Sequence, residues 1–252
     1  MNLGLEKKIV LVTAASKGLG KAVAKKFVEE GAVTYICARD NAALTATAQE
    51  IGAHAVVCDL SQPAAIIELK NRIGKIDVLV TNAGGPKPGF FDAVTDADWQ
   101  TGFDVTFMSA VRLIRAVLPE MQQQRWGRII CMTSTSVKQP LDNLITSNAL
   151  RAAVSNLAKT LSLQIAKDGI TVNTVAPGMF ETDRLTQLIQ KRAEQSGYMF
   201  AEERDMLQRT IPAGRFGSVE EFASSVVFLA SEPASYINGV LLSVDGGITK
   251  SY

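Results

Sequence analysis

The stretch KIVLVTAASKGLG, residues 8–20, decides the fold, because an apolar run stops there in a glycine-containing turn that leads into a helix. The run has no polar face, which is typical of a strand buried on both sides of a parallel sheet. Gly18 and Gly20 let the backbone approach a ligand closely, and residues 21–31 carry apolar side chains at helical spacing. Backbone amides and the helix dipole would face an anion at this junction, so the turn predicts a phosphate-binding site.

Short strands and amphipathic helices alternate along the rest of the chain. The patterns predict further strands at residues 33–38, 53–60, 76–84, 128–134, 170–176 and 239–244, and helices at 42–51, 63–73, 96–121 and 146–168. Pro63 suits the first turn of its helix, and Gly31, Gly52 and Gly74 each end one. Strands joined by such helices imply right-handed crossovers, so we expect an α/β fold, a doubly wound (Rossmann) parallel sheet in a single domain over residues 1–252.

The ligand site of such a sheet lies at the carboxyl edge of the strands, where the winding reverses. Four residues that directly follow or end predicted strands should meet at this edge: Gly18, Asn82, Ser134 and Pro177.

The composition argues against several kinds of partner. The chain has 252 residues with 26 Lys and Arg against 25 Asp and Glu, and no long basic run, so we expect no nucleic-acid partner. It has no apolar stretch of 18 residues, and its first residues, MNLGLEKK, lack the apolar region of a secretory signal. We therefore expect a cytoplasmic protein with no membrane partner that binds a small molecule.

The cysteine and histidine content limits the chemistry. Cys37, Cys58 and Cys131 fall in predicted buried strands without metal-ligand spacing, which favours small core residues over ligands or disulfides. His54 is the only histidine in the sequence. We therefore expect no metal site and no Ser/His/Asp triad.

Six segments in order resemble the short-chain dehydrogenase/reductase family, and the resemblance runs from Lys7 to Gly247. These segments are TAASKGLG (13–20), CDL (58–60), TNAGG (81–85), GRIICMTS (127–134), ITVNTVAPG (170–178) and VDGG (244–247). The resemblance implies a nicotinamide cofactor. The turn around Ser16, Gly18 and Gly20 would bind its pyrophosphate, Asp59 and Leu60 its adenine, Asn82, Ala83 and Gly84 its ribose, and Pro177, Gly178 and Thr182 its nicotinamide end, with Thr13, Lys17, Leu19, Arg39, Arg151 and Phe180 completing the set.

The sequence departs from the family at three of the four positions that hold the family's catalytic residues. The family uses a serine after the fifth strand, a tyrosine thirteen residues later, a lysine four beyond that and an asparagine on the preceding helix. Here the serine position holds Ser134, but the other three hold Ser147, Arg151 and Thr106. A serine hydroxyl is a far poorer acid than a phenol of pKa about 10. Arg151 keeps its charge, and its fork of donors could bind the ribose hydroxyls as a lysine would.

A reductase with this site needs another proton donor. Lys138, in the loop after Ser134, is the first candidate, since burial of its ammonium would lower its pKa toward useful values, although a solvated loop lysine fits equally well. Asp142 and Tyr198 are weaker candidates, and water held by Ser134 and Ser147 is another route.

The second strand favours one form of the cofactor. Enzymes that use NAD(H) usually place a carboxylate at the end of this strand, whereas here Arg39 stands there and Lys17 approaches from the turn. Positive charge favours the 2′-phosphate of NADP(H), with NAD(H) possible if Arg39 instead pairs with Asp40.

Two segments would form the substrate side. Residues 182–217 are a long polar and aromatic excursion with helical patterning broken at Gly197, and residues 84–91 form a loop stiffened by two prolines. Tyr198, Met199 and Phe200 would contact substrate or pack on their own domain.

We therefore predict an NADP(H)-dependent enzyme that interconverts a small-molecule carbonyl compound and an alcohol, resembling 3-oxoacyl-carrier-protein reductases. The alternative is a non-catalytic dinucleotide-binding sensor or partner subunit. The apolar segments FASSVVFLA (222–230) and GVLLSVDGG (239–247) exceed what one edge strand needs to bury, so we also expect a homo-oligomer, a tetramer or dimer.

Overall fold

The computed structural model describes residues 2–251 and shows one sheet of seven parallel strands. The strands are β1 Ile9–Thr13, β2 Val33–Ala38, β3 His54–Val57, β4 Val78–Thr81, β5 Gly127–Met132, β6 Ile170–Pro177 and β7 Leu241–Val244. Their order is β3-β2-β1-β4-β5-β6-β7, so the chain winds outward from β1, returns to β4 and then winds the other way. The predicted doubly wound sheet is confirmed, and its winding reverses between β1 and β4.

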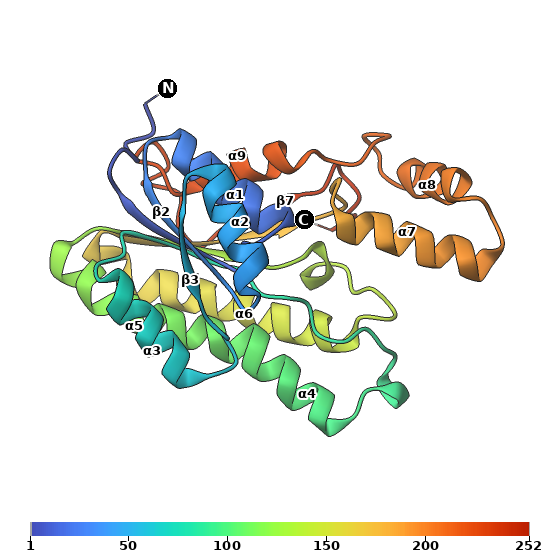
Figure 1. Ribbon diagram of the computed structural model, residues 1–252, viewed down its shortest axis with the longest axis horizontal. Coiled ribbons are helices and arrows are strands. Elements are labelled where there is room, and N and C mark those ends of the chain that lie inside the picture. The colour runs from blue at the N-terminus through green and yellow to red at the C-terminus, as the bar shows by residue number, and fades with distance from the viewer. Residues whose placement is uncertain (1, 252) are drawn as a thin grey trace.

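Helices cover both faces of this sheet (Figure 1). The first face carries α1 Gly18–Glu29, α2 Asn41–Ile51 and α9 Val219–Leu229, and the second carries α3 Pro63–Ile73, α5 Ser109–Gln124 and α6 Ile145–Ile165, with α4 Asp96–Gly102 beyond them. Pro63 is at the start of α3, and Gly52 ends α2 in the left-handed conformation, as the turn signals predict.

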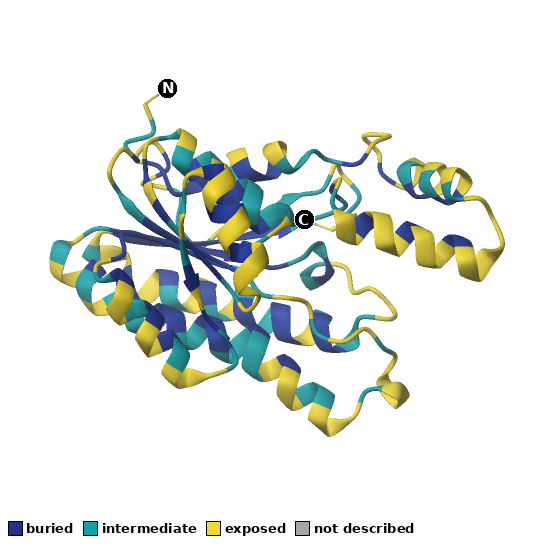
Figure 2. Ribbon diagram, viewed as in Figure 1, coloured by how far each residue is buried: buried dark blue, intermediate teal, exposed yellow. Residues whose placement is uncertain are grey.

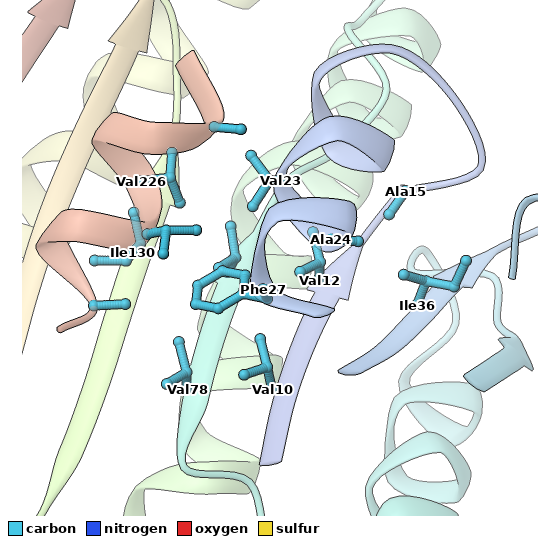
Figure 3. Packing of buried hydrophobic residues seen from close by; sticks show 14 of the residues in the cluster. Val10, Val12, Ala15, Val23, Ala24, Phe27, Ile36, Val78, Ile130 and Val226 are labelled. Carbon is cyan, nitrogen blue, oxygen red and sulfur yellow. The ribbon is translucent and has the colours of Figure 1, made fainter. Parts of the chain in front are cut away.

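Each face has its own apolar core, and the strands between them are buried (Figure 2). On the first face, Phe27 of α1 points toward Val10 and Val78 of the sheet and lies beside Val226 of α9 (Figure 3). Because both faces are covered, central strands such as β1 and β4 are buried along almost their whole length and are apolar except for a terminal threonine. All three cysteines are buried and free, as expected for core residues.

Several element boundaries differ from the predictions. The helix expected at 96–121 is three segments: α4, a π-helical segment Phe103–Met108, and α5. Gly102 precedes the change and packs so closely on α6 that an added β-carbon would lie 2.9 Å from Cγ2 of Thr146. The strands expected at 53–60, 76–84, 128–134 and 239–244 end or begin earlier or later than predicted, because their terminal residues leave the ladder for turns.

The excursion contains two helices, α7 Asp183–Ser196 and α8 Phe200–Arg209, separated at Gly197, which has a φ of 77°. They project from the body of the sheet and are largely exposed (Figures 1 and 2). A small cluster of Leu185, Ile189, Leu207, Ile211 and Phe216 holds them together. Within residues 2–251, no helix has the length and apolar character needed to cross a membrane.

Candidate active site

The four residues expected at the carboxyl edge do lie there. Gly18 follows β1, Asn82 follows β4, Ser134 follows β5, and Pro177 ends β6. Because β1 and β4 are neighbours at the point where the winding reverses, the turn after β1 and the segment after β4 flank the crevice where such sheets bind ligands.

The turn after β1 has the features of an anion site. The N-terminus of α1 has no side-chain cap and no acidic residue in its first turn, so its free amide groups are available to a ligand. Ala14 has a φ of 48° and Gly18 one of 57°, which is costly for the alanine. A β-carbon on Gly20 would lie 2.7 Å from the carbonyl oxygen of Ala14, so the turn needs glycine there. The turn therefore fits the pyrophosphate of a dinucleotide.

Asn82 supports this turn from the neighbouring strand. Its Nδ2 donates a hydrogen bond to the carbonyl oxygen of Ala14 at 3.1 Å, and its backbone is tied to Thr13 Oγ1 in both directions. Ala83 is partly exposed and Gly84 fully open, with nothing within 4 Å of an added β-carbon on Gly84. Asn82 thus positions the turn, while the two residues after it offer open backbone to a ligand.

Among the residues at the predicted adenosine end, the two carboxylates accept hydrogen bonds from the protein, whereas the two cations have no ion-pair partner in the described chain. Asp40 caps α2 by accepting a hydrogen bond from Ala43 N, and the carboxylate of Asp59 accepts hydrogen bonds from Ser61. Arg39 and Lys17 are exposed, and neither takes part in an ion pair among residues 2–251. Arg39 therefore does not pair with Asp40, and its guanidinium is available to an anionic ligand.

The residues predicted for the nicotinamide end surround the end of β6. Thr182 caps α7 through its Oγ1, and Gly178 lies so close to Asp245 that an added β-carbon would be 2.7 Å from Asp245 Cβ. The ring of Phe180 is buried against Phe222 at a centroid distance of 5.3 Å. A cofactor contact from Phe180 would therefore involve its backbone. Leu60, predicted at the adenine, is likewise a core residue.

Ser134, Ser147 and Arg151 meet at the end of β5. Ser134 Oγ accepts a hydrogen bond from Ser136 N at 3.1 Å, and Ser147 Oγ accepts one from Arg151 Nε at 3.1 Å. Arg151 Nη1 also donates to the carbonyl oxygen of Thr133 at 3.0 Å. Each serine oxygen is thus held by an N–H donor, and within residues 2–251 neither hydroxyl hydrogen is used. Both hydroxyls are therefore available to donate to a ligand.

Arg151 is buried without a counterion. It is 8% exposed and forms no ion pair with a carboxylate in the part of the chain that the structure describes. Burial, and secondarily the positive charge of Arg184, lower the pKa of Arg151 to about 10. It therefore remains a cation at neutral pH and places positive charge beside Ser147.

Several hydroxyls after β5, on α6 and on the segment that packs against α6 are unpaired. The side-chain oxygens of Thr106, Thr133, Ser136 and Thr146 are buried without a hydrogen-bond partner in the described chain. Thr106 lies in the π-helical segment, which packs against α6. Buried polar atoms are rarely left unpaired, and π-helical segments are frequent at functional sites. These groups therefore mark the end of β5 as a functional region.

The other proposed proton donors are partly or fully exposed. Lys138 ends the short turn after Ser134 and is partly exposed. Tyr198 is 55% exposed between α7 and α8, and Asp142 is exposed in the loop before α6. None of the three forms an ion pair or a side-chain hydrogen bond among residues 2–251.

Sequence analysis missed Arg184. It stands in the first turn of α7, and a β-carbon on Gly85 would lie 3.1 Å from both of its terminal guanidinium nitrogens. A cation in the first turn of a helix opposes the helix dipole, and that signal could have singled it out.

This fold and site define a dinucleotide-binding oxidoreductase scaffold. A family model described as enoyl-(acyl carrier protein) reductase matches residues 13–249, and the chain belongs to the short-chain dehydrogenase/reductase family. Within that family it is related to the 3-oxoacyl-carrier-protein reductases. The FabG 3-oxoacyl-[acyl-carrier-protein] reductase of Escherichia coli (strain K12) is 34% identical over 98% of this chain and 99% of its own.

Two further relatives span the whole chain. The uncharacterized oxidoreductase YvrD of Bacillus subtilis (strain 168) is 35% identical and covered over its full length. The crystal structure of L-sorbose reductase from Gluconobacter frateurii, solved in complex with NADPH and L-sorbose, is 31% identical, with a TM-score of 0.94 over all of both chains.

Proposed function

We propose that the protein is an NADP(H)-dependent oxidoreductase that reduces a carbonyl compound to an alcohol and catalyses the reverse oxidation. The observation that carries this proposal is the pair of serine hydroxyls, Ser134 and Ser147, held with free hydrogens at the same edge of the sheet as an uncapped phosphate turn. L-sorbose reductase, whose structure holds NADPH, supports the cofactor, and the FabG relatives support the reaction class. The balanced reaction is carbonyl + NADPH + H⁺ → alcohol + NADP⁺.

In this reaction, the residues at the end of β5 would have separate roles. The bound nicotinamide supplies or accepts the hydride. Ser134 and Ser147 donate hydrogen bonds to the carbonyl oxygen, and these bonds strengthen as negative charge develops there. Arg151 holds Ser147 in place and stabilises that charge. Its Nη2, which has no partner within residues 2–251, would bind the ribose hydroxyls.

The site is non-standard for the family in this proposal, because Ser147 and Arg151 stand where the family has tyrosine and lysine. The alkoxide therefore takes its proton from Lys138 or from water bound at the two serines. In the competing reading, the protein binds the dinucleotide without turnover, as a sensor or partner subunit. The observation that favours this second reading is that no phenol or carboxyl group approaches Ser147 among the hydrogen bonds of the described chain.

The cofactor is tested by titrating NADPH and NADH against the wild type and Arg39→Ala. NADPH should bind more tightly, and the substitution should remove most of the difference, about 1 to 3 kcal/mol for a charge-assisted phosphate contact. Equal affinities in the wild type would contradict NADP(H) preference.

The reaction is tested by a carbonyl-substrate screen with Ser134→Ala as the diagnostic variant. It should leave NADPH affinity unchanged and reduce turnover about 100-fold or more. Lys138→Ala separates the two proton routes, since an active variant with an unchanged pH profile excludes Lys138. If Lys138→Ala is inactive, Ser147→Tyr combined with Arg151→Lys should partly restore it. Cofactor binding with no turnover on any carbonyl would favour the sensor.

We also propose that the protein assembles as a homo-oligomer, a tetramer or dimer. β7 is the edge of the sheet, and apolar side chains on it and beside it are exposed, among them Leu242, Phe228 and Tyr236. An exposed edge strand with apolar neighbours is covered in most stable proteins. Light scattering should show a multiple of the 27.0 kDa chain at micromolar concentration, and Leu242→Lys should shift it toward monomer.

A further inference from the structure

The start of α7 lies across the crevice between β1 and β4. Thr182, which caps this helix, is close to the phosphate turn, because a β-carbon on Gly18 would lie 3.8 Å from its Cγ2. Two residues later, the guanidinium group of Arg184 reaches Gly85, in the segment that follows β4, where an added β-carbon would lie 3.1 Å from both terminal nitrogens. Since Gly18 and Gly85 stand on the two flanks of the crevice, the first turn of α7 spans it.

Arg184 carries a charge without a partner in the protein. Its side chain is exposed and forms neither an ion pair nor a hydrogen bond among residues 2–251. A cation is also unfavourable in the first turn of a helix, and only Asp183 in that turn offsets it. The N-terminus of α1, on the other flank of the crevice, is likewise positive, since it has no side-chain cap and no acidic residue in its first turn. Positive groups on both flanks favour an anionic ligand between them.

The order of the strands indicates which anion this is. β1 lies between β2 and β4, so Arg39, which follows β2, and the guanidinium group of Arg184, which reaches the segment after β4, stand on opposite sides of the phosphate turn. Ser134 follows β5, one strand farther from that turn than β4. The anion nearest to Arg184 is therefore the one that the turn itself holds, between a 2′-phosphate at Arg39 and a carbonyl group at Ser134.

We propose that Arg184 binds the pyrophosphate of the dinucleotide from the side opposite the phosphate turn and thereby fixes the start of α7 over the bound cofactor. This inference rests on the proposed function for the identity of the ligand as a nicotinamide dinucleotide. A guanidinium group donates two parallel hydrogen bonds to phosphate oxygens, and both terminal nitrogens of Arg184 are unpaired in the described chain. α7 and α8 project from the body of the sheet and pack on each other through their own apolar cluster (Figure 1), so this contact would add an attachment at the crevice.

The first arm of the test measures the equilibrium binding of NADPH, NADH and ADP-ribose, the last of which keeps the pyrophosphate and lacks the nicotinamide. Arg184→Gln should weaken the binding of all three by the same factor, about 10-fold or more, because the pyrophosphate is common to them. Arg184→Lys should retain part of the affinity, and Arg39→Ala should weaken NADPH alone. Lys191→Gln, which removes an exposed charge from the same helix, is the matched control and should change nothing.

Three results of this arm would overturn the proposal. A loss of affinity confined to NADPH would assign Arg184 to the 2′-phosphate. A loss for NADPH and NADH but not for ADP-ribose would assign it to the nicotinamide end. Unchanged affinities for all three would remove Arg184 from the cofactor site, and a KM raised only for carbonyl substrates that carry a carboxylate would then assign it to the substrate.

The second arm follows amide hydrogen exchange in α7, which does not depend on turnover. Saturating NADPH should slow exchange in the first turns of α7 about 5-fold or more in the wild type, but not in Arg184→Gln saturated with NADPH. Equal protection of α7 in both saturated proteins would overturn the proposed attachment. If this pattern of binding and exchange holds but no carbonyl is reduced, the proposed function fails and the role of Arg184 stands. If carbonyls are reduced and Arg184→Gln binds all three nucleotides as the wild type does, the proposed function stands and this inference fails. A wild type that binds none of the three would overturn both.

Discussion

The two ends of β5 each hold a buried arginine, and the two are treated in opposite ways. At the amino end, Arg128 is 2% exposed, lies 3.6 Å from a carboxylate oxygen of Glu232 and packs on the ring of Trp126 at 4.5 Å. At the carboxyl end, Arg151 is nearly as buried but has hydroxyl and carbonyl partners only, and Arg184 as its charged neighbour. The buried charge is paired with a carboxylate at the amino end of β5, and it has no carboxylate partner at the candidate active site.

The neighbouring charges act on the two guanidinium groups with opposite sign. Burial lowers the pKa of both, but Glu232 opposes this at Arg128, whereas Arg184 adds to it at Arg151. The same pairing rule holds for Asp77 near the amino edge, whose carboxylate accepts a hydrogen bond from Ile9 N and pairs with Lys75. Unpaired charge is therefore a better guide to the ligand site than burial.

The largest expected effect is on the amino end of β5. Arg128→Met keeps the contact with Trp126 but removes the hydrogen bonds to the carbonyl oxygens of Gly127 and Gly169 and the pairing with Glu232. We expect a loss of about 2 kcal/mol in the free energy of unfolding by urea, with turnover per folded molecule unchanged. Arg115→Met, at an exposed position of α5, is the control and should change stability by less than about 0.5 kcal/mol.

A smaller effect is expected at Asp77. Although burial raises the pKa of Asp77, the hydrogen bond from Ile9 N and the ion pair with Lys75 lower it below its ordinary value of 3.8. The unfolded chain therefore binds the proton first, so this stabilisation is present above about pH 4 and is lost as the pH falls through the lowered pKa. Asp77→Asn should cost about 1 kcal/mol at pH 7 and flatten the acid limb of the stability curve. A variant as acid-sensitive as the wild type would assign that sensitivity to other carboxylates.

The comparison also shows what the sequence could and could not provide. Residues 33–38 form β2 with the predicted bounds, because β-branched, aromatic and small apolar residues between Gly31 and Arg39 are typical of a largely buried strand. The gathering of Gly18, Asn82, Ser134 and Pro177 followed from strand order alone. The approach of Arg184 to Gly85 did not, since it depends on how far a side chain reaches between segments that are distant in sequence.

Two local features also could not be predicted from the sequence. The π-helical segment replaces a regular helix without any proline or break in the apolar pattern, because close packing of Gly102 on α6 rather than propensity accompanies it. Asn82, predicted to line the ribose, also donates a hydrogen bond from its amide to Ala14, a role that only the geometry of the turn reveals. The contact of Asn82, Ala83 and Gly84 with the cofactor ribose stays a prediction.

The smallest effect on stability is expected at Arg151, and it decides whether the two arginines differ in kind. The pKa of Arg151 is lowered to about 10 in the folded chain, below its ordinary value, so the unfolded chain keeps its proton to a higher pH and stability rises with pH only above about pH 10. At pH 7 the wild type carries the whole cost of the buried cation, and Arg151→Met removes it together with three hydrogen bonds. The free-energy cost of the buried cation and the contribution of the hydrogen bonds nearly offset each other. Without cofactor, the free energy of unfolding of Arg151→Met should therefore lie within about 1 kcal/mol of the wild-type value or slightly above it. Turnover should fall about 100-fold. Urea unfolding beside Arg128→Met, with and without NADPH, measures this. A loss as large as that of Arg128→Met would show that Arg151 supports the fold, and the contrast between the two ends of β5 would disappear.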